Sequence, residues 1–247
     1  MKSIQSKMLK TENRNENNLK RLHSSVLCLS RFFLNISKGR KKLILHSIRD
    51  ETLRPALDPA RVQPTGNEVR VLAEMIKHET GIKITGGRIG MMLGLEVQTS
   101  GSSCNSRTYR RWVSSGDQPS SIPYAAWAIL AHAAGYKFIW RPKGFSFIDQ
   151  PFTGGIRDGV LASGPDWVTP LPSEFIEVES RIAINAKKET ASARQLNFLI
   201  GGAIGLALHE TGASSVYRAW VTGAKTPSYA HWALMVDLAG LGVIWRP

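Results

Sequence analysis

Two short stretches of similar sequence combine arginine, serine and aromatic residues. They read Ser106-Arg107-Thr108-Tyr109-Arg110-Arg111-Trp112 and Ser214-Ser215-Val216-Tyr217-Arg218-Ala219-Trp220. At helical spacing, the Tyr and Trp of each stretch share one face, and the arginines project from the other. The forked donors of an arginine match O6 and N7 of guanine, and charged side chains also contact phosphates. The chemistry that these stretches predict is therefore hydrogen bonding to base edges and phosphates.

The candidate contact residues lie on these two predicted helices or directly beside them. They are Ser106, Arg107, Arg110, Arg111, Ser214, Ser215, Arg218 and Lys225. Lys225, together with Lys137, is expected to contact phosphates and set the register without reading sequence. Ser106 and Ser214 also suit the N-caps of their helices. The alternative interpretation of the arginines is a solvated helix face that binds nothing.

The two stretches belong to a longer internal repeat. Six of the seven tryptophans fall into matched pairs, and the spacing from Trp127 to Trp140 equals that from Trp232 to Trp245. The segment Gly86–Gly94 aligns with Gly201–Leu208 by its glycine pattern. The period is far longer than that of solenoid repeats, which indicates a duplicated domain. We expect the paired tryptophans to pack in the core, and stacking on bases is the alternative.

The elements around these residues are predicted to be helices joined by turns. Gly116 and Gly223 suit helix ends, and apolar helices follow over 124–134 and 229–239. The runs 138–140 and 243–245 are candidates for a short strand that closes each copy, and 173–199 indicates one or two helices. The predicted fold class is mainly α, with two related helical domains in one chain.

This order of elements resembles the Cro and lambda-repressor-like helix-turn-helix class. The first copy carries the resemblance in Ile89–Gly94, Thr108–Trp112 with Gly116, and Trp127–Gly135. The second carries it in Ile204–Leu208, Val216–Gly223 and Trp232–Gly240. The resemblance covers under half of the chain. It implies that the second helix of each copy enters the major groove of double-stranded DNA.

The two copies depart from the family pattern in different ways. The first is stretched from Leu95 to Asn105 by Gln, Thr, Ser and Gly, and the second has His209 where a turn glycine is usual. The second copy, with its shorter turn, is the better candidate for a working reader of DNA.

The formal net charge of the 247-residue chain is +13, and it is unevenly distributed. Residues 1–66 hold 14 Lys and Arg against 5 Asp and Glu, whereas residues 67–247 hold 18 against 14. We expect residues 1–66 to form a basic, flexible leader, which is solvated, grips phosphates or serves as a targeting segment. The remaining boundaries are a first repeat over 67–142, a linker over 143–172 and a second repeat over 173–247.

Catalytic and metal-binding patterns are weak in this sequence. The string His-Glu-Thr-Gly occurs at His78 and His209 without the second histidine of a zinc protease, and the two cysteines lack zinc-ligand spacing. No apolar run reaches the roughly 18 to 20 residues of a membrane helix. We therefore predict no enzyme activity, no cofactor, no metal and no membrane association.

These observations favour a sequence-specific transcriptional regulator that binds double-stranded DNA as a single-chain pseudo-dimer. The layout resembles regulators of bacterial plasmids, phages or integrative elements, which implies a cytoplasmic protein that joins the nucleoid when bound. A homodimer and a contact with RNA polymerase are further partners to consider. The alternatives are an accessory DNA-binding protein of conjugation or partition, and a protein-interaction module that binds no DNA.

Overall fold

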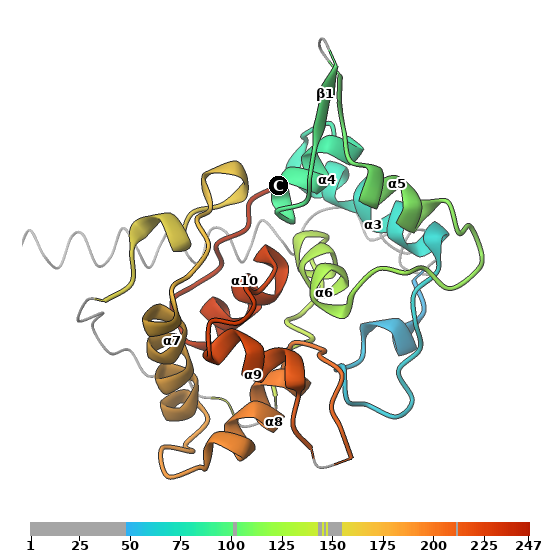
Figure 1. Ribbon diagram of the computed structural model, residues 1–247. Coiled ribbons are helices and arrows are strands. Elements are labelled where there is room, and N and C mark those ends of the chain that lie inside the picture. The colour runs from blue at the N-terminus through green and yellow to red at the C-terminus, as the bar shows by residue number, and fades with distance from the viewer. Residues whose placement is uncertain (1–47, 101–102, 143–144, 146, 148–154, 211) are drawn as a thin grey trace, which may run out of the picture. The chain divides into compact units, whose positions relative to one another are not determined.

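The structure is a computed structural model that describes residues 48–100, 103–142, 145, 147, 155–210 and 212–247. Residues Ser47–Pro247 form one compact unit. Within the described residues this unit contains eight α-helices and one two-stranded hairpin (Figure 1), which confirms the mainly helical prediction.

The elements follow one another in two similar series. The first series is η1 (Asp50–Leu53), α3 (Gly66–Thr80), α4 (Gly86–Met92), β1 (Gln98–Ser100), β2 (Ser103–Asn105), α5 (Arg107–Val113) and α6 (Tyr124–Ala133). The second series is η2 (Asp158–Val160), η3 (Gly164–Asp166), α7 (Pro172–Asn185), α8 (Ala193–Ala203), α9 (Ser215–Val221) and α10 (Tyr229–Leu238). The strands β1 and β2 are antiparallel, with Gln98 opposite Asn105.

The core is built around the two most apolar helices, α6 and α10. Helix α3 packs on α5 and α6, α7 packs on α9 and α10, and α6 contacts α10. The six paired tryptophans are each at most 5% exposed, which confirms their predicted place in the core. In the core their large apolar surfaces are removed from contact with water, and burial of such surface is the main stabilising term of a fold.

A buried glutamate fixes the start of α3 and of α7 through the same set of hydrogen bonds. The Arg49 guanidinium and backbone N–H donate to the Glu68 carboxylate at 2.8 to 3.0 Å, and the Thr65 N–H donates to it at 2.7 Å. Arg157 and the Leu171 N–H bind Glu174 in the same way, at 2.7 to 3.0 Å. The neighbouring segments are thereby tied to the helix N-termini.

The packed part of the chain begins before residue 67, which corrects the predicted leader. Ile48 is buried, and the Trp127 indole N–H donates to the Thr52 carbonyl at 2.7 Å. Residues 48–66 therefore belong to the folded unit, while residues 1–47 lie outside the described residues. The latter hold 11 Lys and Arg against 2 Asp and Glu, so the whole excess charge of the expected leader falls there.

The second half of the expected linker is also packed. Ile156 and Val160 are buried, and the Trp232 indole N–H donates to the Val160 carbonyl at 2.7 Å. This contact repeats the one between Trp127 and Thr52. The linker residues 143, 144, 146 and 148–154 lie outside the described residues. Residues 155–172 thus belong with the second series of elements.

The predicted closing strands are wrong, because residues 138–140 and 243–245 have no strand structure. The Tyr124 hydroxyl donates to the Ile139 carbonyl at 3.0 Å, and the Tyr229 hydroxyl donates to the Ile244 carbonyl at 3.1 Å. These carbonyls therefore bond to tyrosine side chains instead of a neighbouring strand. The described strands occur in the stretch between α4 and α5.

The structure also corrects the alignment of the first helix of each predicted helix-turn-helix. Gly90 packs against Ser106, and the residue in the same position against Ser214 is Gly201, not Gly205. Helix α8 ends at Ala203, so Gly205 lies in the turn with a positive φ of 79°, as Gly94 does with 61°. The segment 204–208, which the glycine pattern assigned to a helix, is therefore turn and loop. The true counterpart of Gly90 is Gly201, four residues before Gly205.

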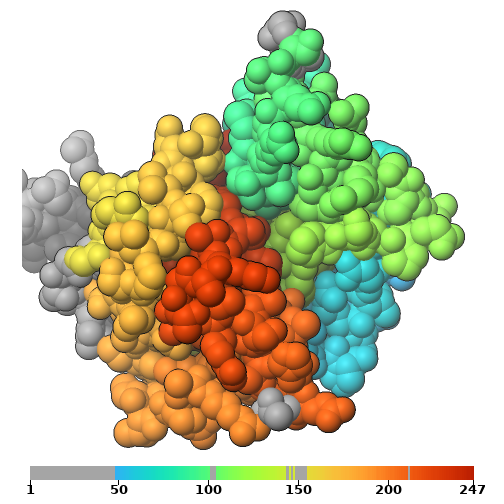
Figure 2. All heavy atoms as spheres, in the orientation of Figure 1, coloured from blue at the N-terminus to red at the C-terminus, as the bar shows by residue number. Residues whose placement is uncertain are grey.

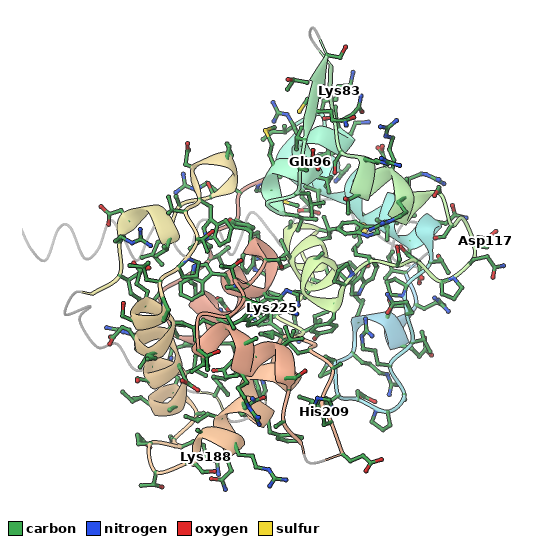
Figure 3. The ribbon with its side chains drawn as sticks, in the orientation of Figure 1. Lys83, Glu96, Asp117, Lys188, His209 and Lys225 are labelled. Carbon is green, nitrogen blue, oxygen red and sulfur yellow. The ribbon has the colours of Figure 1, made fainter. Side chains whose placement is uncertain are left out.

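The corrected register makes the two connections more alike than the sequence suggested. Twelve residues separate Leu93 from Ser106, and nine separate Ile204 from Ser214. His209 lies in the second connection (labelled in Figure 3), where its N–H donates to the Ala213 carbonyl at 2.9 Å. The first copy is thus extended by three residues, which lengthen its connection into the β1–β2 hairpin.

The two series of elements contact each other reciprocally. A Cβ on Gly94 would overlap Tyr229, and a Cβ on Gly205 would overlap Tyr124, so each turn glycine admits the tyrosine of the opposite series. Trp140 and Trp245 meet edge to face with ring centroids 5.4 Å apart. A reciprocal set of contacts is the mark of an interface with approximate two-fold symmetry.

One position breaks this symmetry with a buried carboxylate. Asp237 on α10 is 1% exposed and accepts hydrogen bonds from the Trp140 indole at 2.9 Å and from the Arg141 guanidinium at 2.6 and 2.9 Å. His132 occupies the corresponding place on α6, where its ring lies 5.4 Å from that of Trp245. Burial lowers the pKa of His132, which favours the neutral imidazole.

Candidate nucleic-acid interface

Helix α5 presents an arginine face to solvent and an aromatic face to the core. Tyr109 is 9% exposed and Trp112 is 2% exposed, and α5 packs against α3 and α4 through this side. Burial raises the pKa of Tyr109 to about 12, so the phenol is neutral at ordinary pH. With two large rings anchored, the helix cannot rotate without exposing them, and its outer face is therefore fixed.

The outer face of α5 is basic, and its cations are available. The side chains of Arg107, Arg110 and Arg111 are exposed, and with Thr108 and Ser114 they line a hollow of about 570 Å³. Within the described part of the chain, none of the three forms an ion pair with a carboxylate. Guanidinium groups so placed can bind phosphate or guanine with both nitrogens of the fork.

Helix α9 has the same construction with a sparser basic face. Tyr217 and Trp220 are buried, whereas Ser215 and Arg218 are exposed. The Tyr217 hydroxyl donates to a Glu179 carboxylate oxygen at 2.9 Å, and burial raises the pKa of both groups. The structure thus places Arg218 where α5 has Arg110, and it places no cation where α5 has Arg107 and Arg111.

The two predicted contact serines are instead buried helix caps. Ser106 and Ser214 are both 0% exposed, and each hydroxyl accepts a hydrogen bond at 3.4 Å, from the N–H of Tyr109 and of Tyr217 respectively. The capping prediction is confirmed for both residues. Because neither side chain reaches the surface, we leave Ser106 and Ser214 out of the candidate contact face.

The two predicted phosphate contacts lie on loops. Lys225 is exposed between α9 and α10 (labelled in Figure 3), and its backbone N–H donates to the Ala219 carbonyl at 3.0 Å. Lys137 is exposed beyond the end of α6. Both ammonium groups are free to move, which suits contacts that set register and read no sequence.

Two features near these helices were missed by the sequence patterns. Arg194 on α8 lines a hollow of about 420 Å³ together with Arg218 and Glu179. The β1–β2 hairpin stands out from the surface beside α4 and α5 (Figure 2). The polar run Gln98-Thr99-Ser100 signals a loop, and only the pairing seen in the structure reveals a hairpin. Arg194 belongs to a helix whose bounds the misaligned glycines hid.

Within the described residues, no group of three or more His, Cys, Asp or Glu side chains is arranged to hold a metal ion. None of the helices in the described ranges is both long enough and apolar enough to span a bilayer. His78 of the first His-Glu-Thr-Gly string lies near the end of α3, and His209 of the second lies in the loop after α8, so the two histidines share no structural setting.

The fold and this surface define a mainly helical protein with two short helices that each combine a buried aromatic face with a basic outer face. The chain is 44% identical over 98 residues to the transcriptional repressor protein KorC of Escherichia coli, a match that covers 40% of this chain and 95% of the relative. A second KorC of Escherichia coli is 41% identical over 95 residues, which is 38% of this chain and 92% of that protein. The chain therefore belongs to the family of KorC transcriptional repressors.

No family model matches the chain, and no solved structure matches it either.

Proposed function

We propose that this protein is a transcriptional repressor of a bacterial mobile element that binds double-stranded DNA in a sequence-specific way. In this proposal the chain contains two copies of one helix-turn-helix domain of the Cro and lambda-repressor-like kind, and α5 and α9 are the recognition helices. The two copies act as a single-chain pseudo-dimer on two adjacent half-sites. The function is non-enzymatic and uses no cofactor.

The observation that carries the proposal is the outer face of α5. Three exposed arginines, which pair with no carboxylate among the described residues, lie on a helix that buried Tyr109 and Trp112 hold in place. A repressor that reads DNA sequence needs such a face, because base readout requires donors on an element whose orientation is fixed. A merely solvated helix has no need for a rigid arrangement of unpaired cations.

The pseudo-dimer is supported by the length of the relatives and by the contacts between copies. The KorC match of 98 residues has about the length of the stretch 48–142, which is the length that one copy would have in this proposal. The Trp140–Trp245 contact and the reciprocal glycine–tyrosine contacts join the copies as the two subunits of a symmetric dimer are joined. Repressor dimers place their recognition helices in successive major grooves through such an arrangement.

The test is duplex binding by variants of the two recognition helices. Arg110→Ala should weaken binding to the operator by roughly 5- to 150-fold, the effect expected for one bidentate contact to guanine. Arg218→Ala should do the same at the other half-site. Fluorescence anisotropy at several salt concentrations, with operator found by genome-wide mapping of bound sites, would measure both effects.

A matched control removes a cation that is already neutralised. Lys77 on α3 pairs with Glu74 at 3.1 Å, so Lys77→Ala should leave the affinity for the operator unchanged. If Arg110→Ala and Arg218→Ala also bind the operator like the unmodified protein, α5 and α9 are not recognition helices. If no duplex is bound above non-specific levels, the protein is an interaction module and the proposal fails as a whole.

A further inference from the structure

The β1–β2 hairpin is an exposed polar element that belongs to the first copy alone. Gln98, Thr99, Ser100 and Asn105 are all exposed, and none of them carries a charge. The hairpin follows α4 and ends directly before Ser106, the N-cap of α5. It projects beyond both helices (Figure 1).

The hairpin is held rigidly at its base on α4. Cys104 on β2 lies against Gly87, where a Cβ would overlap the Cys104 carbonyl, and a Cβ on Gly90 would lie 2.9 Å from the Val97 side chain. Gly87 therefore permits a close approach of the β2 backbone, and Gly90 leaves room for the side chains of Val97 and Ser106. Because α4 also packs on α5, the direction of the hairpin relative to the arginine face is fixed.

The pairing register decides which side chains point away from α4. Gln98 pairs with Asn105, and Thr99 pairs with Cys104, so the two pairs lie on opposite faces of the hairpin. Cys104 faces α4, and the amides of Gln98 and Asn105 consequently share the opposite face. Side-chain amides of Asn and Gln match N6 and N7 of adenine, and they also donate to phosphate oxygens.

The second copy offers no equivalent surface. Its connection is three residues shorter, and among its described residues the comparable pairing is the hydrogen bond from the His209 N–H to the Ala213 carbonyl. His209 and Ala213 stand there in place of Gln98 and Asn105. The two halves of the molecule therefore differ by one projecting element, and this element carries hydrogen-bonding groups without charge.

We infer that the β1–β2 hairpin is a second DNA-contacting element, which extends the half-site of the first copy beyond the reach of α5 through the amides of Gln98 and Asn105. This inference rests on the proposed function. It makes the operator asymmetric, with a longer contact on the α5 side than on the α9 side. A two-stranded ribbon is narrow enough to enter the major groove or to follow its edge.

The absence of charge gives the hairpin a signature that separates it from the arginines. Loss of a cation that neutralises a phosphate lowers the slope of affinity against salt, because fewer counterions are released on binding. Loss of an amide contact lowers affinity and leaves that slope unchanged. The two kinds of contact can therefore be told apart in one titration series.

The experiment compares the unmodified protein with a double variant, Gln98→Ala with Asn105→Ala, on the mapped operator. We expect affinity to fall roughly 10- to 100-fold, with an unchanged salt slope, and hydroxyl-radical protection to be lost at one end of the footprint only. Thr99→Val on the opposite face is the matched control and should bind like the unmodified protein. A chain in which residues 98–105 are replaced by residues 209–213 should lose the same protection.

The outcomes separate this inference from the proposed function. If Arg110→Ala weakens binding while the double variant and the replacement leave affinity and footprint unchanged, the hairpin makes no contact with DNA and the inference is overturned. If the unmodified protein binds no specific duplex, the proposed function fails first. Circular dichroism and thermal unfolding of the double variant check that the scaffold is intact, since exposed amides contribute little to stability.

Discussion

The two copies keep the same scaffold contacts and differ in what they present to solvent. Each has an arginine clamped on a buried glutamate, an indole bonded to the carbonyl of a preceding 3-10 helix, and a tyrosine bonded to a carbonyl near its end. In contrast, α5 carries three exposed arginines where α9 carries one, and the hairpin extends only the first connection. The two series of elements therefore share hydrogen bonds in the core and differ at the surface.

The largest expected effect comes from substitution of Asp237, the carboxylate that only one of the two halves has. Asp237→Ala should destabilise the fold by about 3–5 kcal/mol, because it leaves the Trp140 indole and the Arg141 guanidinium without their acceptor in a largely buried place. His132→Ala at the matching position leaves no charged group without its partner, so it should lower the free energy of unfolding by less. Urea unfolding of both variants, followed by circular dichroism, measures the difference.

Equal losses from these two variants would contradict an asymmetric interface. A loss of stability with Asp237→Ala that becomes smaller when Arg141→Met is added would support it, since the second change removes the unpaired cation and leaves only the Trp140 indole without its acceptor.

The glutamate clamps give a second comparison, through pH. Hydrogen bonds from Arg157 lower the pKa of Glu174 from 4.5 to about 2, whereas burial opposes the hydrogen bonds from Arg49 that lower the pKa of Glu68. The stabilisation from Glu174 is complete above its ordinary pKa and is lost as the pH falls from about 4.5 toward 2. Acid titration of Glu174→Gln should show a flatter loss of stability over this range.

Glu68→Gln is the reference for that titration, and it should flatten the acid transition less than Glu174→Gln does. A larger effect of Glu68→Gln would mean that the first clamp, and not the second, dominates acid stability.

The smallest expected effects come from the two caps, and here the copies should agree. Ser106→Ala and Ser214→Ala each remove one capping hydrogen bond and should each cost about 1 kcal/mol of stability. DNA affinity, measured where both variants remain folded, should stay unchanged. A loss of affinity in either variant under those conditions would restore that serine to the contact face.

Much of the scaffold could be predicted from the sequence because aromatic spacing is a strong signal. The Trp127–Trp140 and Trp232–Trp245 spacings located α6 and α10, and the tyrosine and tryptophan of α5 and α9 located the faces of these helices. The exposed arginines follow from the same periodicity. A large ring must be buried, so its position fixes the helix around it.

The remainder depended on contacts that composition conceals. Residues 55–66 fall within the predicted flexible leader, yet the hydrogen bonds of Arg49 and Gln63 hold this segment on the core. The glycine pattern misaligned α8, because a glycine that admits a tyrosine and a glycine inside a helix look alike in a sequence. The sequence predicts a stretched turn where the structure has a hairpin, because Ser and Gly residues carry no pairing signal of their own.

The Asp237 carboxylate has no counterpart in the first half, so the two halves differ in their ability to pair with an identical copy of themselves. A separated second half would carry the acceptor Asp237 and also Trp245 and Arg246, the counterparts of the donors Trp140 and Arg141. Two identical second halves could therefore form these hydrogen bonds with each other. A separated first half would offer Trp140 and Arg141 to a twin that presents only His132. Because both halves are joined in one polypeptide, the first half always has the second half, with its Asp237, as its partner, whatever the concentration of the protein.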